Sequence, residues 1–225
     1  MPIDMIEKDA MISIMAEKND RGKSLVNKII RRIWRRGHGS VFSANDFADL
    51  GNRAAIDIAL GRLVRQGRIR RIARGLYDYP IVDADLGELN PSIEAIAKTL
   101  SLSGRLRLQP SGAYAANLLG LSEQVPMKIV FLTDGPSRKI LIKNREIIFK
   151  RTTPRNMAAA GRLGGIVIQA LRYLGNDAIT VEMKSRLKTA IPSEQREGVV
   201  KDALSAPAWI RTLLRELLVE EVVGK

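Results

Sequence analysis

The stretch of residues 42–80 constrains the fold more than any other part of the chain. It reads FSANDFADLGNRAAIDIALGRLVRQGRIRRIARGLYDYP. The pattern predicts a short helix capped by Ser43, a Gly-Asn turn at residues 51–52 and a second helix over residues 53–66. A tight hairpin rich in arginine is predicted to follow over residues 68–79. Helix, turn, helix and basic hairpin, in that order, predict a winged helix-turn-helix.

The second helix of this unit separates its apolar residues from its charged residues. Asn52 is placed to cap the helix. One stripe of side chains is expected to be buried: Ile56, Ala59, Leu60, Leu63 and Val64. In a winged helix-turn-helix the second helix enters the major groove of DNA and the wing follows the backbone. Arg53, in the first turn, is therefore a candidate for reading a base edge, whereas Arg62 and Arg65 are candidates for phosphate contacts.

The charge of the chain is concentrated in the same region. Residues 21–80 hold fourteen Lys or Arg and four Asp, which is +10 of a total net charge of +13. A field concentrated on one small segment attracts polyanions more effectively than an even excess does. A basic surface that serves only solubility is the alternative interpretation.

We expect two domains joined by a short acidic linker. Residues 1–80 form the winged helix-turn-helix domain, with residues 1–20 as an N-terminal extension, a helix over residues 23–36 and a short strand over residues 40–42 that pairs with the wing. Residues 81–91, which lie between two prolines, are predicted to be a linker.

Residues 92–225 are predicted to form an α+β domain with a helical tail. Strands come first in this part of the chain and helices dominate after residue 157, an order typical of the α+β class. The predicted elements are a helix at 92–100, a strand at 105–109, a helix at 113–121, strands at 127–132, 138–142 and 147–152, and helices at 178–189, 194–203 and 209–218.

A second basic cluster lies in this domain. Residues 128–172 hold ten Lys or Arg and two acidic residues, and most of the excess falls in one predicted hairpin. The candidates for a second basic surface are Arg138, Lys139, Lys143, Arg145, Lys150 and Arg151. A DNA-contacting or partner-binding surface and a merely solvated hairpin are equally compatible with the pattern.

Nothing in the sequence indicates an enzyme, a metal site or a cofactor. The chain has no cysteine and one histidine, His38, which alone cannot build a typical zinc site. Phosphate-binding, nucleophile-elbow and zinc-protease motifs are absent, and the run GRLGG at residues 161–165 is better explained by close helix packing. Aromatic residues make up only 4% of the chain, which disfavours recognition of single strands by base stacking.

No apolar run approaches the length of a membrane span, and no signal-peptide pattern opens the chain. We therefore expect a cytoplasmic protein without a membrane partner.

The chain resembles the AbiEi family, the antitoxins of AbiE-type (type IV) toxin–antitoxin systems. The resemblance lies in the run GHGSVFSANDFADLGNRAAIDIALGRLVRQGRIRRIARGLYDYP, above all in RLVRQG and RRIARGLYDYP, and in LQPSGAYAANLLGLSEQVP followed by KIVFLTDG. These runs cover most of residues 23–155. The helical tail adds nothing specific to the resemblance.

This resemblance implies a repressor of its own toxin–antitoxin operon that binds inverted repeats in double-stranded promoter DNA. The cognate toxin would be a nucleotidyltransferase-like protein, countered through the C-terminal domain without a long-lived complex. Carried over to this sequence, the DNA-contacting positions are Asn52, Arg53, Arg62, Arg70, Arg71 and Arg74, with no catalytic residue. A stand-alone winged-helix regulator, whose second domain binds a ligand or a protein, is the alternative; a nucleic-acid-processing enzyme is disfavoured because no acidic cluster is present.

Overall fold

The computed structural model describes residues 24–142 and 145–219. Helices and strands are both well represented, so the protein is of a mixed α/β class, in agreement with the predicted α+β composition. The chain divides into two compact units, residues 1–99 and residues 100–225, which we call the N-terminal and the C-terminal unit.

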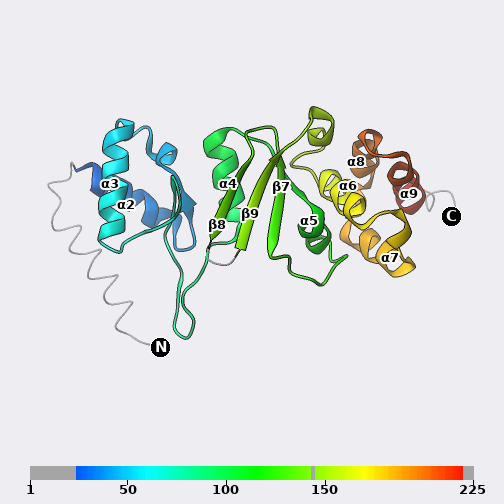
Figure 1. The fold of residues 1–225 in the computed structure, drawn as a ribbon, viewed down its shortest axis with the longest axis horizontal. Helices are drawn as coiled ribbons and strands as arrows, with labels where there is room; N and C mark the ends of the chain where they lie inside the picture. Colours follow the sequence, from blue (N-terminus) through cyan, green and yellow to red (C-terminus); the bar gives the residue numbers. More distant parts are fainter. Residues whose placement is uncertain (1–23, 143–144, 220–225) are drawn as a thin grey trace. The chain divides into compact units, whose positions relative to one another are not determined.

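The N-terminal unit is a helical pair packed against a small sheet (Figure 1). Its elements are α2 (Leu25–Arg36), β1 (Val41–Phe42), the 3₁₀ turn η1 (Ala44–Phe47), α3 (Arg53–Arg65), β2 (Arg70–Ala73) and β3 (Leu76–Asp78). The strands form an antiparallel sheet in the order β1-β3-β2, with Phe42 opposite Tyr77. As predicted, the short strand before η1 pairs with the hairpin. Phe42 and Phe47 are fully buried in the core between helices and sheet.

Local capping explains where α3 and η1 begin. Asn52 Oδ1 accepts a hydrogen bond of 2.9 Å from the Ala55 amide, so α3 begins at Arg53, as predicted. Asp46 Oδ2 accepts from the Ser43 amide at 2.8 Å in the predicted capping box. The helix expected after this box is only the single turn η1, because the following backbone bonds span three residues and end at Leu50.

Residues 81–91, predicted to be a linker, contain a short hairpin of β4 (Val82–Asp83) and β5 (Gly87–Glu88). Asp83 Oδ1 accepts from the amides of Asp85 and Leu86, both at 2.9 Å, and these bonds lower the pKa of the Asp83 carboxyl. Part of the acidic segment that was predicted to be a linker therefore closes a turn. The division between the units falls later, between residues 99 and 100.

The C-terminal unit contains a four-stranded mixed sheet. Its elements, in chain order, are α4 (Ile93–Gly104, which begins in the N-terminal unit), β6 (Leu108–Ser111), α5 (Gly112–Leu118), β7 (Lys128–Thr133), β8 (Arg138–Ile142), β9 (Arg145–Arg151), α6 (Leu163–Leu174), α7 (Val181–Ala190), α8 (Arg196–Asp202) and α9 (Ala208–Val219). The strand order is β6-β7-β9-β8, in which β7 and β9 run parallel and the other pairs antiparallel. The strands predicted at 127–132, 138–142 and 147–152 are present, and the last two pair as the predicted hairpin. The strand predicted at 105–109 begins only at Leu108, and the pairing of β7 with β6 and β9 was not predicted.

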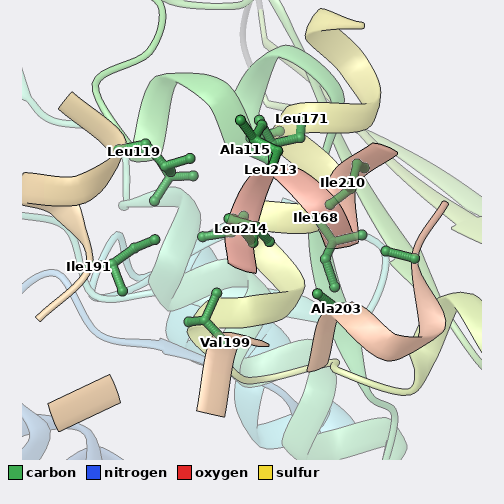
Figure 2. Packing of buried hydrophobic residues seen from close by; sticks show 14 of the residues in the cluster. Ala115, Leu119, Ile168, Leu171, Ile191, Val199, Ala203, Ile210, Leu213 and Leu214 are labelled. Atoms are coloured by element: carbon green, nitrogen blue, oxygen red, sulfur yellow. The ribbon is translucent and has the colours of Figure 1, made fainter. Parts of the chain in front are cut away.

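The helices that follow the sheet share an apolar core with α5 (Figure 2). Ala115, Ile168 and Leu214 are fully or almost fully buried at its centre. A Cβ on Gly165 would overlap the carbonyl oxygen of Ala159 and the side chain of Gln109, so α6 can pack closely only with glycine there. This confirms the packing interpretation of the GRLGG run for Gly165, whereas Gly161 lies before the helix at φ +81° and a Cβ there would meet no atom within 4 Å. Across the described ranges, no helix is both long enough and apolar enough to span a bilayer.

Candidate nucleic-acid interface

Helix α3 turns its charged residues away from the core of the N-terminal unit. The buried stripe of Ile56, Ala59, Leu60 and Leu63 fixes the rotation of the helix about its axis. Arg53, Arg62 and Arg65 are all exposed outside this stripe, as predicted. Val64, placed in the stripe by the sequence, is only partly buried.

Four arginines on α3 and the hairpin that follows it are exposed and uncommitted, and Arg35 on α2 is a fifth such arginine among the described residues. Arg62 and Arg65 lie on α3, Arg71 lies on β2, and Arg74 lies in the turn before β3. None of the four makes an ion pair or hydrogen bond through its side chain with another residue that the structure describes. A hydrated guanidinium of this kind can bind a phosphate in bidentate geometry without first breaking an internal bond. We call these four residues the arginine set.

Arg53 and Asn52, two further candidates, are already engaged in local bonds. Arg53 Nε donates to Asp57 Oδ2 and Arg53 Nη1 donates to Asn45 Oδ1, both at 2.9 Å. Its Nη2 has no acceptor among the described residues, and the two bonds hold the guanidinium in a fixed orientation. The Asn52 side chain caps α3 through its carbonyl oxygen, so its first role is structural.

Arg70 is placed differently from the prediction. Its guanidinium donates to Asp78 at 3.1 Å and 2.6 Å, to Glu88 at 3.0 Å and to the carbonyl oxygen of Leu89 at 2.6 Å. The hydrogen bond to Asp78, whose side chain is 1% exposed, raises the pKa of Arg70 against the opposing effect of burial. Arg70 therefore joins the β2–β3 hairpin to the β4–β5 hairpin, and four of its five N–H donors are occupied by internal acceptors.

Two ion pairs that the sequence did not reveal hold α2 against the segment before α3. Arg32 forms a bidentate pair with Asp49 at 2.6 Å and 2.7 Å and donates to the carbonyl oxygen of Asp46 at 3.0 Å. This guanidinium lowers the pKa of the Asp49 carboxyl. Arg36 pairs with the Asp46 carboxylate at 2.9 Å. Part of the local +10 is thus neutralised inside the unit, whereas the arginine set, Lys28 and Arg35 are exposed without an ion pair among the described residues.

The His38 ring forms a hydrogen bond with a backbone carbonyl group and stacks on a tyrosine ring. Its Nδ1 lies 2.7 Å from the carbonyl oxygen of Pro80, and its ring lies 4.0 Å from that of Tyr79. Within the described residues, no group of three or more His, Asp or Glu side chains is arranged to hold a metal ion.

The second basic cluster is divided by the geometry of its strands. Neighbouring residues of a strand point to opposite faces, and paired residues point to the same face. Arg138 pairs with Phe149 and Ile142 with Arg145, which places Arg138, Arg145 and Arg151 on the face that buries Ile147 and Phe149. Lys139 and Lys150 lie on the opposite face. Lys143 is outside the described residues.

Two of these cations are also engaged locally. Lys139 Nζ lies 3.2 Å from Glu146 Oε1, and the Arg138 guanidinium lies 5.9 Å from the centre of the Phe149 ring. Arg145, Lys150 and Arg151 are exposed. The hairpin therefore does not bring its six predicted basic residues onto one surface.

A family model described as a family of unknown function, DUF6088, matches residues 28–199, and the chain belongs to this family. Among solved structures, the chain is similar to the RV2827C protein from Mycobacterium tuberculosis, with 14% identity, a TM-score of 0.36 and coverage of 79% of this chain and 76% of that one. No curated protein matches the chain.

Proposed function

We propose that this protein is a winged helix-turn-helix DNA-binding antitoxin that represses its own operon. The observation that carries the DNA-binding part is the arginine set, because four exposed and uncommitted guanidinium groups lie on α3 and on the hairpin that follows it. In this arrangement α3 is the recognition helix and the β2–β3 hairpin is the wing. Phosphate contacts from both elements would position the helix in the major groove.

Arg53 is the proposed base-reading residue. Its bonds to Asp57 and Asn45 hold the guanidinium in place before DNA arrives, and Nη2 makes no hydrogen bond to another residue that the structure describes. A guanine presents two acceptors in the major groove, O6 and N7, which suit an arginine of fixed orientation.

The antitoxin part of the proposal follows from the resemblance of residues 23–155 to the AbiEi family. On this proposal the partners are double-stranded promoter DNA with inverted repeats and a nucleotidyltransferase-like toxin. The C-terminal unit would counter the toxin without a lasting complex.

The test is footprinting of the full chain on the DNA immediately upstream of its own gene, with binding titrated against salt. If about six phosphates are neutralised, log K should fall against log salt with a slope of about −5. Replacing Arg62 and Arg65 with Ala should make this slope less steep by about 2, from about −5 to about −3. The matched control replaces Arg211 and Arg215, two exposed arginines of α9, and should leave the slope unchanged.

A slope near zero, or equal affinity for single-stranded DNA, would reject the DNA-binding proposal. The antitoxin part is tested separately by co-expression of the full chain with the neighbouring gene. Promoter repression without rescue of growth would favour a stand-alone regulator.

A further inference from the structure

A large apolar side chain stands at the centre of the exposed face of α3. Ile58 is 69% exposed, although it lies in the middle of the helix, between Arg53 and Arg62. The buried stripe lies on the opposite side of the helix, so Ile58 contributes nothing to the core. Its nearest helical neighbour one turn earlier is Ala54, which is exposed as well.

The same face carries a glycine that the fold does not require. Gly61 is in the interior of α3, where glycine is less favourable than alanine. A Cβ built on Gly61 meets no other atom within 4 Å, and its backbone has no positive φ. This contrasts with Gly165 of α6, where packing excludes a side chain. Because Gly61 has no side chain, another molecule can approach the backbone of α3 more closely beside Ile58.

The charge around Ile58 identifies what can occupy this face. Arg62 and Arg65 flank it and are uncommitted within the described residues, so the surface suits a polyanion better than a second apolar protein face. In the major groove of DNA, the apolar group that is presented at the base edges is the C5 methyl of thymine. Building on the proposed function, we infer that Ile58 reads thymine methyl groups, with Gly61 allowing the close approach of α3.

The test compares two versions of the footprinted promoter duplex. In the second version, the thymines inside the footprint are replaced by uracil, which keeps the base pairing and removes the methyl groups. Wild-type protein should lose affinity about four-fold for each contacted methyl group. Ile58→Ala should bind the two duplexes with the same affinity. Leu86→Ala, which removes a side chain that is 77% exposed on the turn between β4 and β5, should discriminate as wild type does.

Equal binding of both duplexes by the wild type, or full discrimination by Ile58→Ala, would overturn the inference and leave the proposed DNA binding intact. A change of oligomeric state in Ile58→Ala, with unchanged discrimination, would assign this face to a protein contact and would also overturn it. Absence of any footprint would reject the proposed function itself, and the inference with it.

Gly61→Ala tests whether Gly61 serves the close approach of α3 to DNA or the folding of the protein. Because the added methyl group meets only open space, we expect the melting temperature to rise by about 2–4 °C. Affinity for the promoter should fall, since the methyl group would hold the helix away from the bases. Gly198→Ala on α8 is the matched control, because its Cβ also meets no atom, and it should raise stability without loss of affinity. Unchanged affinity of Gly61→Ala would remove Gly61 from the inference.

Discussion

The two basic regions of the molecule, residues 21–80 and 128–172, are both rich in Lys and Arg. They differ in how their secondary structure presents this charge. In the N-terminal unit, Arg62 and Arg65 are three residues apart on a helix, so they lie on neighbouring positions of one surface. In the C-terminal unit, Lys139 and Arg138 are adjacent on a strand, so they point to opposite faces of the sheet. The period of the secondary structure, and not the number of cations, decides whether charges converge.

The regions differ also in how far their charges are already compensated. The arginine set has no side-chain partner within the described residues, whereas Lys139 is paired with Glu146 and Arg138 lies over Phe149. A cation with an internal partner must lose it before it can bind a phosphate. The first region is therefore the better candidate for a nucleic-acid surface, although both gave strong basic signals in the sequence.

The largest expected effect comes from removing each set of charges in turn. Replacing the arginine set with alanine should lower affinity for duplex DNA by on the order of 10³-fold at about 0.1 M salt, because about four counterion-releasing contacts are lost. The matched variant replaces Arg138, Arg145, Lys150 and Arg151, which removes the same charge from exposed positions. It should change the salt slope by less than about 1. Fluorescence anisotropy across a salt series measures both.

Equal losses in the two variants would break the comparison, because they would show that DNA contacts the basic hairpin as well as α3. Circular dichroism of each variant serves as the control for folding.

A smaller effect, on stability instead of binding, distinguishes Arg70 from its neighbour Arg71. Arg70→Ala leaves the buried carboxylate of Asp78 without its guanidinium and should lower the free energy of unfolding by about 3 kcal/mol. Arg71→Ala should change stability by less than about 0.5 kcal/mol, because its side chain is exposed and unpaired among the described residues. Urea unfolding of both variants measures this difference. If Arg71→Ala proved as destabilising as Arg70→Ala, Arg71 would have a structural role and would leave the arginine set.

Local rules in the sequence predicted the N-terminal unit well. Asn52 and the stripe from Ile56 to Leu63 specified α3 because capping and helical periodicity act over a few residues. The contacts of Arg32 with Asp49 and of Arg70 with Glu88 and Leu89 could not be predicted, since each joins residues 17 to 19 positions apart. Arg70 and Asp78 are only eight positions apart, but their pairing depends on the register of the hairpin. For the same reason the arginine run alone could not separate Arg70 from Arg71.

The C-terminal unit shows the same limit. Alternating and apolar runs predicted the strands, but the parallel pairing of β7 with β9 depends on contacts across the intervening β8. The alternation of a strand is enough to place Arg138 and Lys139 on different faces, but only the register of β8 with β9 places Arg138 on the same face as Arg145 and Arg151.

The smallest expected effect concerns the acid stability of the surface pair Arg32–Asp49. The guanidinium lowers the pKa of Asp49 below its ordinary value of 3.8, so the pair stabilises the fold fully above that pH. This contribution is lost as the pH falls through the lowered pKa, when the folded protein also binds the proton. The difference in stability between wild type and Asp49→Asn should therefore be present at about pH 7 and should shrink as the pH falls below 3.8.

Urea unfolding followed by the fluorescence of Trp34, in a Trp209→Phe background, reports on the unit that contains this pair. Asp85→Asn is the matched control, because it removes an exposed carboxylate that has no ion pair among the described residues, and its effect should not follow the same pH profile. Salt should weaken the effect of Asp49→Asn, since both side chains are partly exposed, at 33% for Arg32 and 63% for Asp49. If the effect persisted undiminished at pH 3, Asp49 would stabilise the N-terminal unit through its shape and hydrogen bonds instead of its charge.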